Sequence, residues 1–389
     1  MPSGTAFAPD ASTCGRGWRL TRVRRRTGRS AFSSRQHRLL DTLICSWRIA
    51  RCWRCRLTRV FTPALTKQGE RLSPWPCGRG YRVAGYWRRE VSRPYLLLKE
   101  KTAVDKMPAS RLVLNPDELN SDPVPGMDLA VKLGIGQLEI RSAEGANAVT
   151  LPDDRVRYLR TLAEERGLKV AALASPLWKW CRPEATPERV DTFGFPTQVP
   201  PEARLGWIER AIEAAVILGA PVVRVFSHLR VEPELTEQLL GDLLLAKALD
   251  LANSAGVRLL LENEPVCTVA HAESLLEVLD RYHGQGLGLW LDVANLHEVG
   301  QATGEVVSSL APYVGYVHVK DYRPAADGGG RVFCPAGEGV VPYGQVLPLL
   351  HAAQPGLPYA LETHVRDTPA DALTSGAAFL RSAVTGGVA

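Results

Sequence analysis

The sequence lacks the features that mark membrane-bound, secreted or dinucleotide-binding proteins. No apolar run in its 389 residues reaches the roughly 18 residues that a membrane span requires. The amino-terminal region has no apolar stretch of the kind found in a secretory signal. No predicted strand is followed by a glycine-rich phosphate loop. We therefore expect a soluble, cytoplasmic protein with no membrane partner.

Acidic residues are scarce in only one part of the chain. Residues 1–106 contain 24 Lys and Arg against 6 Asp and Glu, a net charge of +18, whereas residues 107–389 contain 23 against 35, a net charge of −12. The cysteines divide in the same way, with five before residue 107 and three after it. Because Cys181, Cys267 and Cys334 are scattered through an acidic domain, we predict free thiols in a reducing compartment.

Residues 1–106 show no sustained hydrophobic period, so we predict that they form no packed core. Arg interleaved with Trp would suit a nucleic-acid-binding arm. An Arg-rich, acid-poor composition would also suit an organellar transit peptide. A third alternative is a zinc site made by Cys45, Cys52, Cys55 and Cys77. We favour a disordered extension, or upstream sequence translated from a mis-assigned start, because globular sequence begins at Met107.

From residue 107 onward, short apolar runs alternate with longer amphipathic ones. Strict alternation over residues 107–389 predicts a single (β/α)₈ TIM barrel, with a doubly wound open sheet as the rival fold. The predicted strands are, in order, "RLVLN", "GQLEIR", "LKVAALAS", "PVVRVFSH", "VRLLLENE", "GLGLWLD", "VGYVHVK" and "YALETH". After a short first helix that ends near Gly134, the predicted helices are Pro152–Gly167, Glu202–Gly219, Glu234–Gly256, Val269–Tyr282, Gly304–Pro312, Tyr343–Ala353 and Pro369–Ala383.

Each of the last four predicted strands carries a metal-ligating side chain near its carboxyl end. These side chains are Glu262, Asp292, His318 and Glu362, and Glu264 is a second acid at the end of the same strand as Glu262. The carboxyl ends of parallel strands meet at the barrel mouth, so the four should converge there. Burying three carboxylates without a counter-charge would be costly, and a divalent cation supplies that charge. Mn²⁺, Mg²⁺ or Co²⁺ suits oxygen ligands with one imidazole, and Zn²⁺ is a further candidate.

The period of 2 in a strand also predicts which residues share a face with the four candidates. Leu260, Trp290, Tyr316 and Ala360 each precede one of them by two positions. The structural alternatives are an ion-pair role for each Glu, a helix N-cap role for Asp292 and a core role for His318. We expect Glu139 and Arg224 to form a buried ion pair. The candidate substrate contacts are Arg141, Lys179, His228, Asn295, Lys320 and Arg323.

Residues 107–389 resemble the sugar phosphate isomerase/epimerase family with the xylose isomerase-like barrel. The resemblance is carried by "QLEIRSAEGANAV", "LASPLWKW", "APVVRVFS", "RLLLENE", "LDVANLH", "YVHVKD", "PAGEGVVPYGQVL" and "LETH". In that family the metal ligands come from the fifth to eighth strands, and they correspond to Glu262, Asp292, His318 and Glu362. Many characterised epimerases have a substrate-binding His three residues after the Asp, where this chain has Asn295. The resemblance therefore does not identify the sugar.

The resemblance implies a divalent-metal-dependent isomerase or epimerase that acts on a ketose, an aldose or a related sugar. Glu262 and Glu362 would transfer protons through a metal-stabilised enediolate. The alternatives are a metal-dependent dehydratase of a keto-polyol or dehydroshikimate-like acid, which would share the first step, and a non-catalytic sugar-binding barrel. Apurinic endonucleases share the fold, but their zinc cluster needs more His ligands, and the net charge of −12 opposes DNA binding. The expected partner is a small sugar. The sequence does not determine the oligomeric state, and a homo-oligomer is one alternative.

Overall fold

The structure is a computed structural model, and it describes residues 111–188, 190–191, 193–326 and 328–383. The predicted extension, residues 1–106, lies outside them, as do its four candidate zinc-binding cysteines and the predicted domain start at Met107. Cys181, Cys267 and Cys334 are buried and free, as predicted.

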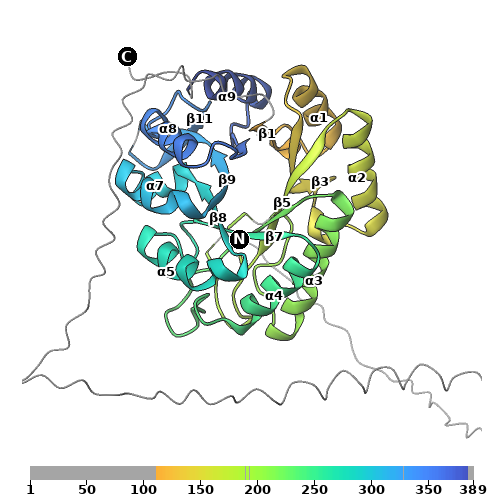
Figure 1. Ribbon diagram of the computed structural model, residues 1–389, viewed down its shortest axis with the longest axis vertical. Coiled ribbons are helices and arrows are strands. Elements are labelled where there is room, and N and C mark those ends of the chain that lie inside the picture. The colour runs from red at the N-terminus through yellow and green to blue at the C-terminus, as the bar shows by residue number, and fades with distance from the viewer. Residues whose placement is uncertain (1–110, 189, 192, 327, 384–389) are drawn as a thin grey trace, which may run out of the picture. The chain divides into compact units, whose positions relative to one another are not determined.

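Eight parallel strands close into a barrel that the helices surround (Figure 1), which confirms the predicted fold class. Its strands are β1 (Leu112–Leu114), β2 (Gln137–Ile140), β5 (Lys169–Leu177), β6 (Val222–Val225), β7 (Arg258–Glu262), β8 (Gly288–Asp292), β9 (Val314–Val319) and β12 (Tyr359–Leu361). Each strand pairs with its neighbour, and β1 pairs with both β2 and β12. This last pairing brings the two ends of the described chain together and completes the ring.

The helices cover the outer face of the barrel. They are α1 (Pro123–Lys132), α2 (Asp153–Glu165), α3 (Pro201–Leu218), α4 (Leu243–Ser254), α5 (Ala272–Tyr282), α6 (Val293–Glu298), α7 (Gly304–Leu310), α8 (Tyr343–Ala353) and α9 (Pro369–Ala383). Short 3₁₀ turns occur at Pro116–Glu118, Ala148–Thr150, His283–Gln285 and Ala311–Tyr313. A large apolar core fills the layer between these helices and the strands.

Several elements differ from the prediction, among them the short helix α6, which was not expected. The helix expected over Glu234–Gly256 begins only at Leu243, because Gly241 has a φ of +84° and Asp242 caps the helix by accepting from Leu244 N. A hairpin of β10 (Asp321–Pro324) and β11 (Arg331–Cys334) follows β9, and a smaller one joins β3 (Ser142–Ala143) to β4 (Ala146–Asn147). Neither hairpin was predicted.

A second, smaller apolar cluster fills the barrel interior. Among its members are Leu260, Trp290, Tyr316 and Ala360. Trp290 and Tyr316 lie with ring centroids 3.9 Å apart, so they close the barrel beneath its mouth. Each of the four precedes a predicted metal ligand by two positions, and alternation along a strand therefore points those ligands into the barrel one layer higher. The period-2 prediction is thus confirmed.

The loop before α8 is anchored by one carboxylate. Asp321 follows β9 and accepts hydrogen bonds from the backbone N–H groups of Gly337, Gly339 and Val341 at 2.9–3.1 Å. A side chain at Gly339 would overlap the Asp321 carboxylate, so this position requires glycine. The Gly337-Glu338-Gly339 segment therefore serves to wrap the loop around Asp321.

Candidate metal centre

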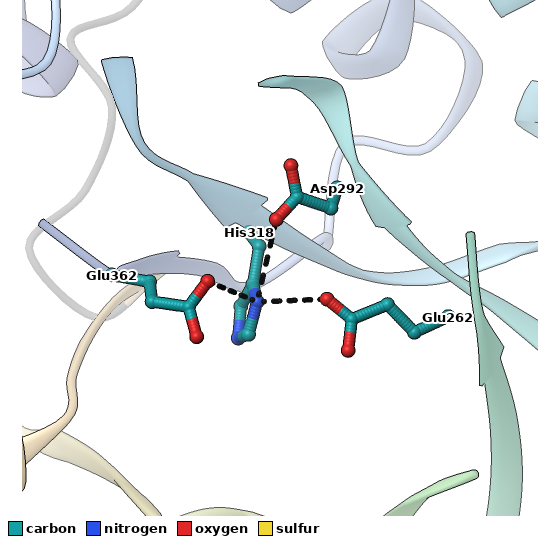
Figure 2. Close-up of side chains that lie close together, drawn as sticks. All are labelled: Glu262, Asp292, His318 and Glu362. Atoms are coloured by element: carbon teal, nitrogen blue, oxygen red, sulfur yellow. Dashed lines mark ion pairs between the residues drawn. The ribbon is translucent and has the colours of Figure 1, made fainter. Parts of the chain in front are cut away.

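Four side chains converge at the barrel mouth, three from β7, β8 and β9 and one from the residue directly after β12 (Figure 2). Each offers one ligand atom, and these atoms all lie within 4.8 Å of one another. We call this group the acid–histidine cluster; it consists of Glu262, Asp292, His318 and Glu362. All four side chains are buried, and His318 and Asp292 are fully inaccessible to solvent. The strand register places Asp292 directly beside His318.

Each carboxylate of the acid–histidine cluster has one anchored oxygen. Glu262 Oε2 lies 3.0 Å from Arg224 Nη1, and Glu362 Oε1 lies 2.6 Å from Arg141 Nη1. Asp292 Oδ1 accepts a hydrogen bond of 2.8 Å from the backbone N–H of Asn295. These anchors come from outside the cluster, so they leave the second oxygen of each carboxylate to face inward.

The three inward oxygens surround one imidazole nitrogen (Figure 2). His318 Nδ1 is 3.3 Å from Glu262 Oε1, 3.3 Å from Glu362 Oε2 and 3.8 Å from Asp292 Oδ2. A lone pair on Nδ1 would face three negative oxygens, which is unfavourable in a buried site. Positive charge is therefore needed at this point. The Lys320 ammonium group supplies part of it, at 2.7 Å from Asp292 Oδ2, and a proton on Nδ1 or a cation among the four atoms would supply the rest.

The other imidazole nitrogen is held by a buried carboxylate. His318 Nε2 donates to Glu139 Oε2 at 2.8 Å, and Asn115 Nδ2 donates to the other Glu139 oxygen at 3.3 Å. Such a carboxylate–histidine pair orients a metal-binding imidazole and increases its basicity. The expected Glu139–Arg224 ion pair is wrong, because Glu139 binds His318 and Arg224 binds Glu262.

The local charges shift the pKa values of the cluster in different directions. Burial alone would raise the pKa of Glu262, but Arg224 and His318 outweigh it and lower it to about 2. Burial likewise opposes ionisation of Glu362, yet Lys320 and His318 hold its pKa well below the usual range. Burial raises the pKa of Asp292, with Lys320 opposing the shift. Burial would lower the pKa of His318, but Glu139 and Glu362 raise it well above its usual value.

The acid–histidine cluster fits a divalent cation. Its ligand atoms are three carboxylate oxygens and one imidazole nitrogen, a set suited to Mn²⁺, Mg²⁺, Co²⁺ or Zn²⁺. Within the described part of the chain, His318 Nδ1 has no hydrogen-bond partner although it is buried. The geometry thus places one imidazole nitrogen and three inward oxygens around one point, and an ion bound there would take the place of a proton on that nitrogen.

Asp292 also acts as a helix cap. Its hydrogen bond from Asn295 N begins α6, a six-residue helix that directly follows β8. The N-cap alternative considered for Asp292 is therefore correct for Oδ1, while Oδ2 remains directed toward His318. One carboxylate thus performs both tasks, because its two oxygens point in different directions.

A cavity of about 310 Å³ opens above the acid–histidine cluster, and we call it the mouth cavity. Glu262 and Glu362 line it, as do three of the predicted substrate contacts, Lys179, Asn295 and Lys320. The Asn295 side chain is 3% exposed, and its Nδ2 has no hydrogen-bond partner among the described residues. A buried amide donor without an acceptor is costly, so this donor is available to a molecule in the mouth cavity.

Three other predicted substrate contacts lie outside the lining of the mouth cavity. Arg141 is buried behind Glu362, where Asp117 and Glu118 also bind its guanidinium. His228 is buried 3.4 Å from Asp242 Oδ2, and the side chain of Arg323 is 56% exposed and pairs with Glu338. These three side chains pair with carboxylates outside the mouth-cavity lining, and their substrate role stays a prediction.

The mouth cavity also contains residues that the sequence analysis missed. Arg331 and Phe333 line it from β11, and His364 and Arg366 line it from the segment after β12. His364 shares strand parity with Glu362, and this signal could have identified it. Arg331 and Phe333 depend on the β10–β11 hairpin, for which the sequence showed only a glycine turn.

A larger cavity of about 490 Å³ lies at the opposite end of the barrel. Gln137, Lys169 and Val222, each at or near the start of its strand, are part of its lining. None of the acid–histidine cluster lines it. The chemistry of the site therefore belongs to the smaller cavity at the carboxyl ends of the strands, where TIM-barrel enzymes have their active sites.

Over the part of the chain that the structure describes, no helix is both long and apolar enough to cross a membrane. No curated protein matches the chain. Among solved structures, it is similar to a xylose isomerase-like TIM barrel protein from Mycobacterium smegmatis in complex with magnesium, at 17% identity and a TM-score of 0.53, covering 71% of this chain and 97% of that one.

Two further solved structures are similar to the chain. One is the probable 3-DHS dehydratase AsbF of Bacillus anthracis, at 16% identity and a TM-score of 0.53, covering 69% of this chain and 98% of that one. The other is an L-ribulose 3-epimerase, at 16% identity and a TM-score of 0.52, covering 71% and 94%. At these identities the likeness shows the fold alone. The family model for the xylose isomerase-like TIM barrel matches residues 127–383, and the chain belongs to that family.

Proposed function

We propose that the chain is a divalent-metal-dependent isomerase or epimerase of a ketose, an aldose or a related sugar. The observation that carries the proposal is the convergence of three inward carboxylate oxygens on His318 Nδ1 at the base of the mouth cavity. The cavity volume of about 310 Å³ is at the small end of the range for ligand sites. A monosaccharide-sized compound suits such a space.

The acid–histidine cluster would hold one divalent ion, with Mn²⁺, Mg²⁺ or Co²⁺ favoured. When bound, the ion would polarise a substrate carbonyl and stabilise the negative charge that develops as the neighbouring carbon loses its proton. Similar proteins include a magnesium complex and a zinc-binding protein, which supports a divalent ion without identifying it.

Proton transfer is assigned to the two glutamates of the cluster. Glu262 and Glu362 come from β7 and β12, which β8 and β9 separate, and they approach His318 from different sides (Figure 2). The lowered pKa values of both side chains favour the carboxylate form, which is the form that accepts a proton. Epimerisation needs a base on both faces of the reacting carbon, whereas isomerisation can proceed with one.

Substrate oxygens are assigned to donors at the base of the mouth cavity. Asn295 Nδ2 is a buried donor without a described acceptor, and Asn295 lies one helical turn beyond Asp292. Lys179 and Lys320 also line the cavity, although Glu264 and the acid–histidine cluster bind their ammonium groups. Asn295 is thus the strongest of the three assignments, because a substrate hydroxyl or carbonyl would satisfy it.

Solvent isotope exchange tests this proposal. The full chain, stripped of metal and supplied with Mn²⁺, is incubated in deuterated water with a panel of ketoses, aldoses and keto acids. Deuterium at the carbon next to the carbonyl with an otherwise unchanged formula indicates an isomerase or epimerase. Loss of water indicates the alternative, a dehydratase of a keto-polyol or dehydroshikimate-like acid.

Glutamate variants connect the activity to the site. Glu262→Gln and Glu362→Gln should each lower the exchange rate by about 10²–10⁴-fold, the usual contribution of a general base. Glu338→Gln provides the control, because Glu338 pairs with Arg323 away from the mouth cavity. Background metal content in a folded, Mn²⁺-supplemented sample would refute the metal-dependent function.

A further inference from the structure

Lys320 contacts the inward face of the acid–histidine cluster. Its Nζ lies 2.7 Å from Asp292 Oδ2 and 3.2 Å from Glu362 Oε2. These are the oxygens that face His318 Nδ1. The ammonium group therefore binds two of the atoms that a metal ion would use.

The neighbouring arginines are arranged differently. Arg224 binds Glu262 through Oε2 and Arg141 binds Glu362 through Oε1, and neither of these oxygens faces His318. Both guanidinium groups can therefore keep their contacts while a cation occupies the cluster. Lys320 cannot keep both of its contacts without placing a positive charge beside the ion.

The side chain of Lys320 also has room to move. It lines the mouth cavity, and it carries a compact charge on a flexible four-carbon stem. Like charges repel strongly at short range in a buried site. Binding of a divalent ion would therefore have to displace the ammonium group or weaken its contacts with Asp292 and Glu362.

We propose that Lys320 is a built-in competitor of the metal ion, which neutralises Asp292 and Glu362 when no metal is bound and thereby weakens divalent affinity. This inference rests on the proposed metal site. It makes Lys320 a residue that sets metal affinity through the cluster. Removal of the ammonium group should tighten metal binding and, in the absence of metal, should destabilise the barrel through uncompensated carboxylates.

Metal affinity and stability together test the competitor role. The full-length wild type, Lys320→Met and Lys320→Gln are stripped of metal and titrated with Mn²⁺, with free Mn²⁺ followed by electron paramagnetic resonance. Both variants should bind Mn²⁺ about tenfold or more tightly than the wild type, since one repelling charge is removed. Without metal, both variants should melt at a lower temperature than the wild type. Addition of Mn²⁺ should raise their melting temperatures by more than it raises that of the wild type.

Two further variants separate charge from side-chain packing. Lys320→Arg keeps the charge and should not tighten Mn²⁺ binding. Lys179→Met removes a charge that lines the same cavity but pairs with Glu264, and it should leave Mn²⁺ affinity unchanged. If Lys320→Met does not fold, Lys320→Gln provides the same comparison.

The outcomes distinguish this inference from the proposed function. Unchanged or weaker Mn²⁺ binding in Lys320→Met, with a wild type that binds, overturns the competitor role and leaves the metal site standing. Absence of Mn²⁺ binding in every folded variant overturns both. Binding that appears only in the Lys320 variants supports the competitor role, and it shows that the wild-type site does not hold Mn²⁺ by itself.

Discussion

Replacement of Glu139 by Gln should weaken metal binding while the barrel stays folded. Glu139 accepts from His318 Nε2 at 2.8 Å and from Asn115 Nδ2 at 3.3 Å. Gln has nearly the same shape and can still accept from the imidazole, so the orientation of His318 is retained. The substitution removes the negative charge that makes the imidazole a better ligand, together with the acceptor that Asn115 Nδ2 uses.

The structure indicates the size of this effect. Loss of an outer partner of a metal-binding His typically costs about 10–100-fold in affinity, or about 1.4–2.7 kcal/mol. Glu139 and His318 are both fully buried, so water neither screens their interaction nor replaces the lost charge. We therefore expect a decrease of Mn²⁺ affinity in the upper half of that range.

Calorimetric titration of the metal-stripped full chain with Mn²⁺ measures the effect, and circular dichroism checks the fold. Glu237→Gln is a matched control, because Glu237 pairs with Arg204 at 2.7 Å and lies outside the acid–histidine cluster. An affinity for Mn²⁺ that is the same in Glu139→Gln and in the wild type would refute the reasoning, since it would mean that the buried pair does not influence the ligand nitrogen.

Two further predictions concern stability and thiol chemistry. Asp321→Ala should lower the free energy of unfolding by about 3 kcal/mol or more, because it leaves three or more backbone N–H groups without an acceptor. Urea denaturation measures this free energy. A loss below about 1 kcal/mol would contradict the anchoring role of Asp321. Burial raises the pKa of Cys267 to about 12, so iodoacetamide at pH 8 should label its peptide far more slowly in the native chain than in urea. Equal labelling of the Cys267 peptide in both conditions, read by mass spectrometry, would contradict its burial.

Much of the fold could be predicted because the signals are local. Alternating apolar runs and amphipathic helices determine eight βα units, and alternation within each strand places Glu262, Asp292, His318 and Glu362 on the face occupied by Leu260, Trp290, Tyr316 and Ala360. The start of α4 was missed, because a single glycine with positive φ ended the helical pattern. Arg331 was missed because β11 forms only by pairing with β10.

The sequence by itself determined which side chains reach the barrel mouth, since the direction of a side chain in a strand depends on its position in that strand. Only the tertiary structure decided which groups each of them meets. Arg141 and Glu362 are 221 positions apart, and Glu139 and His318 are 179 apart. Their contacts arise where β1 joins β2 to β12 and closes the ring. No periodicity encodes such pairs, because the distance between them depends on the barrel closing and on the packing of every strand in between.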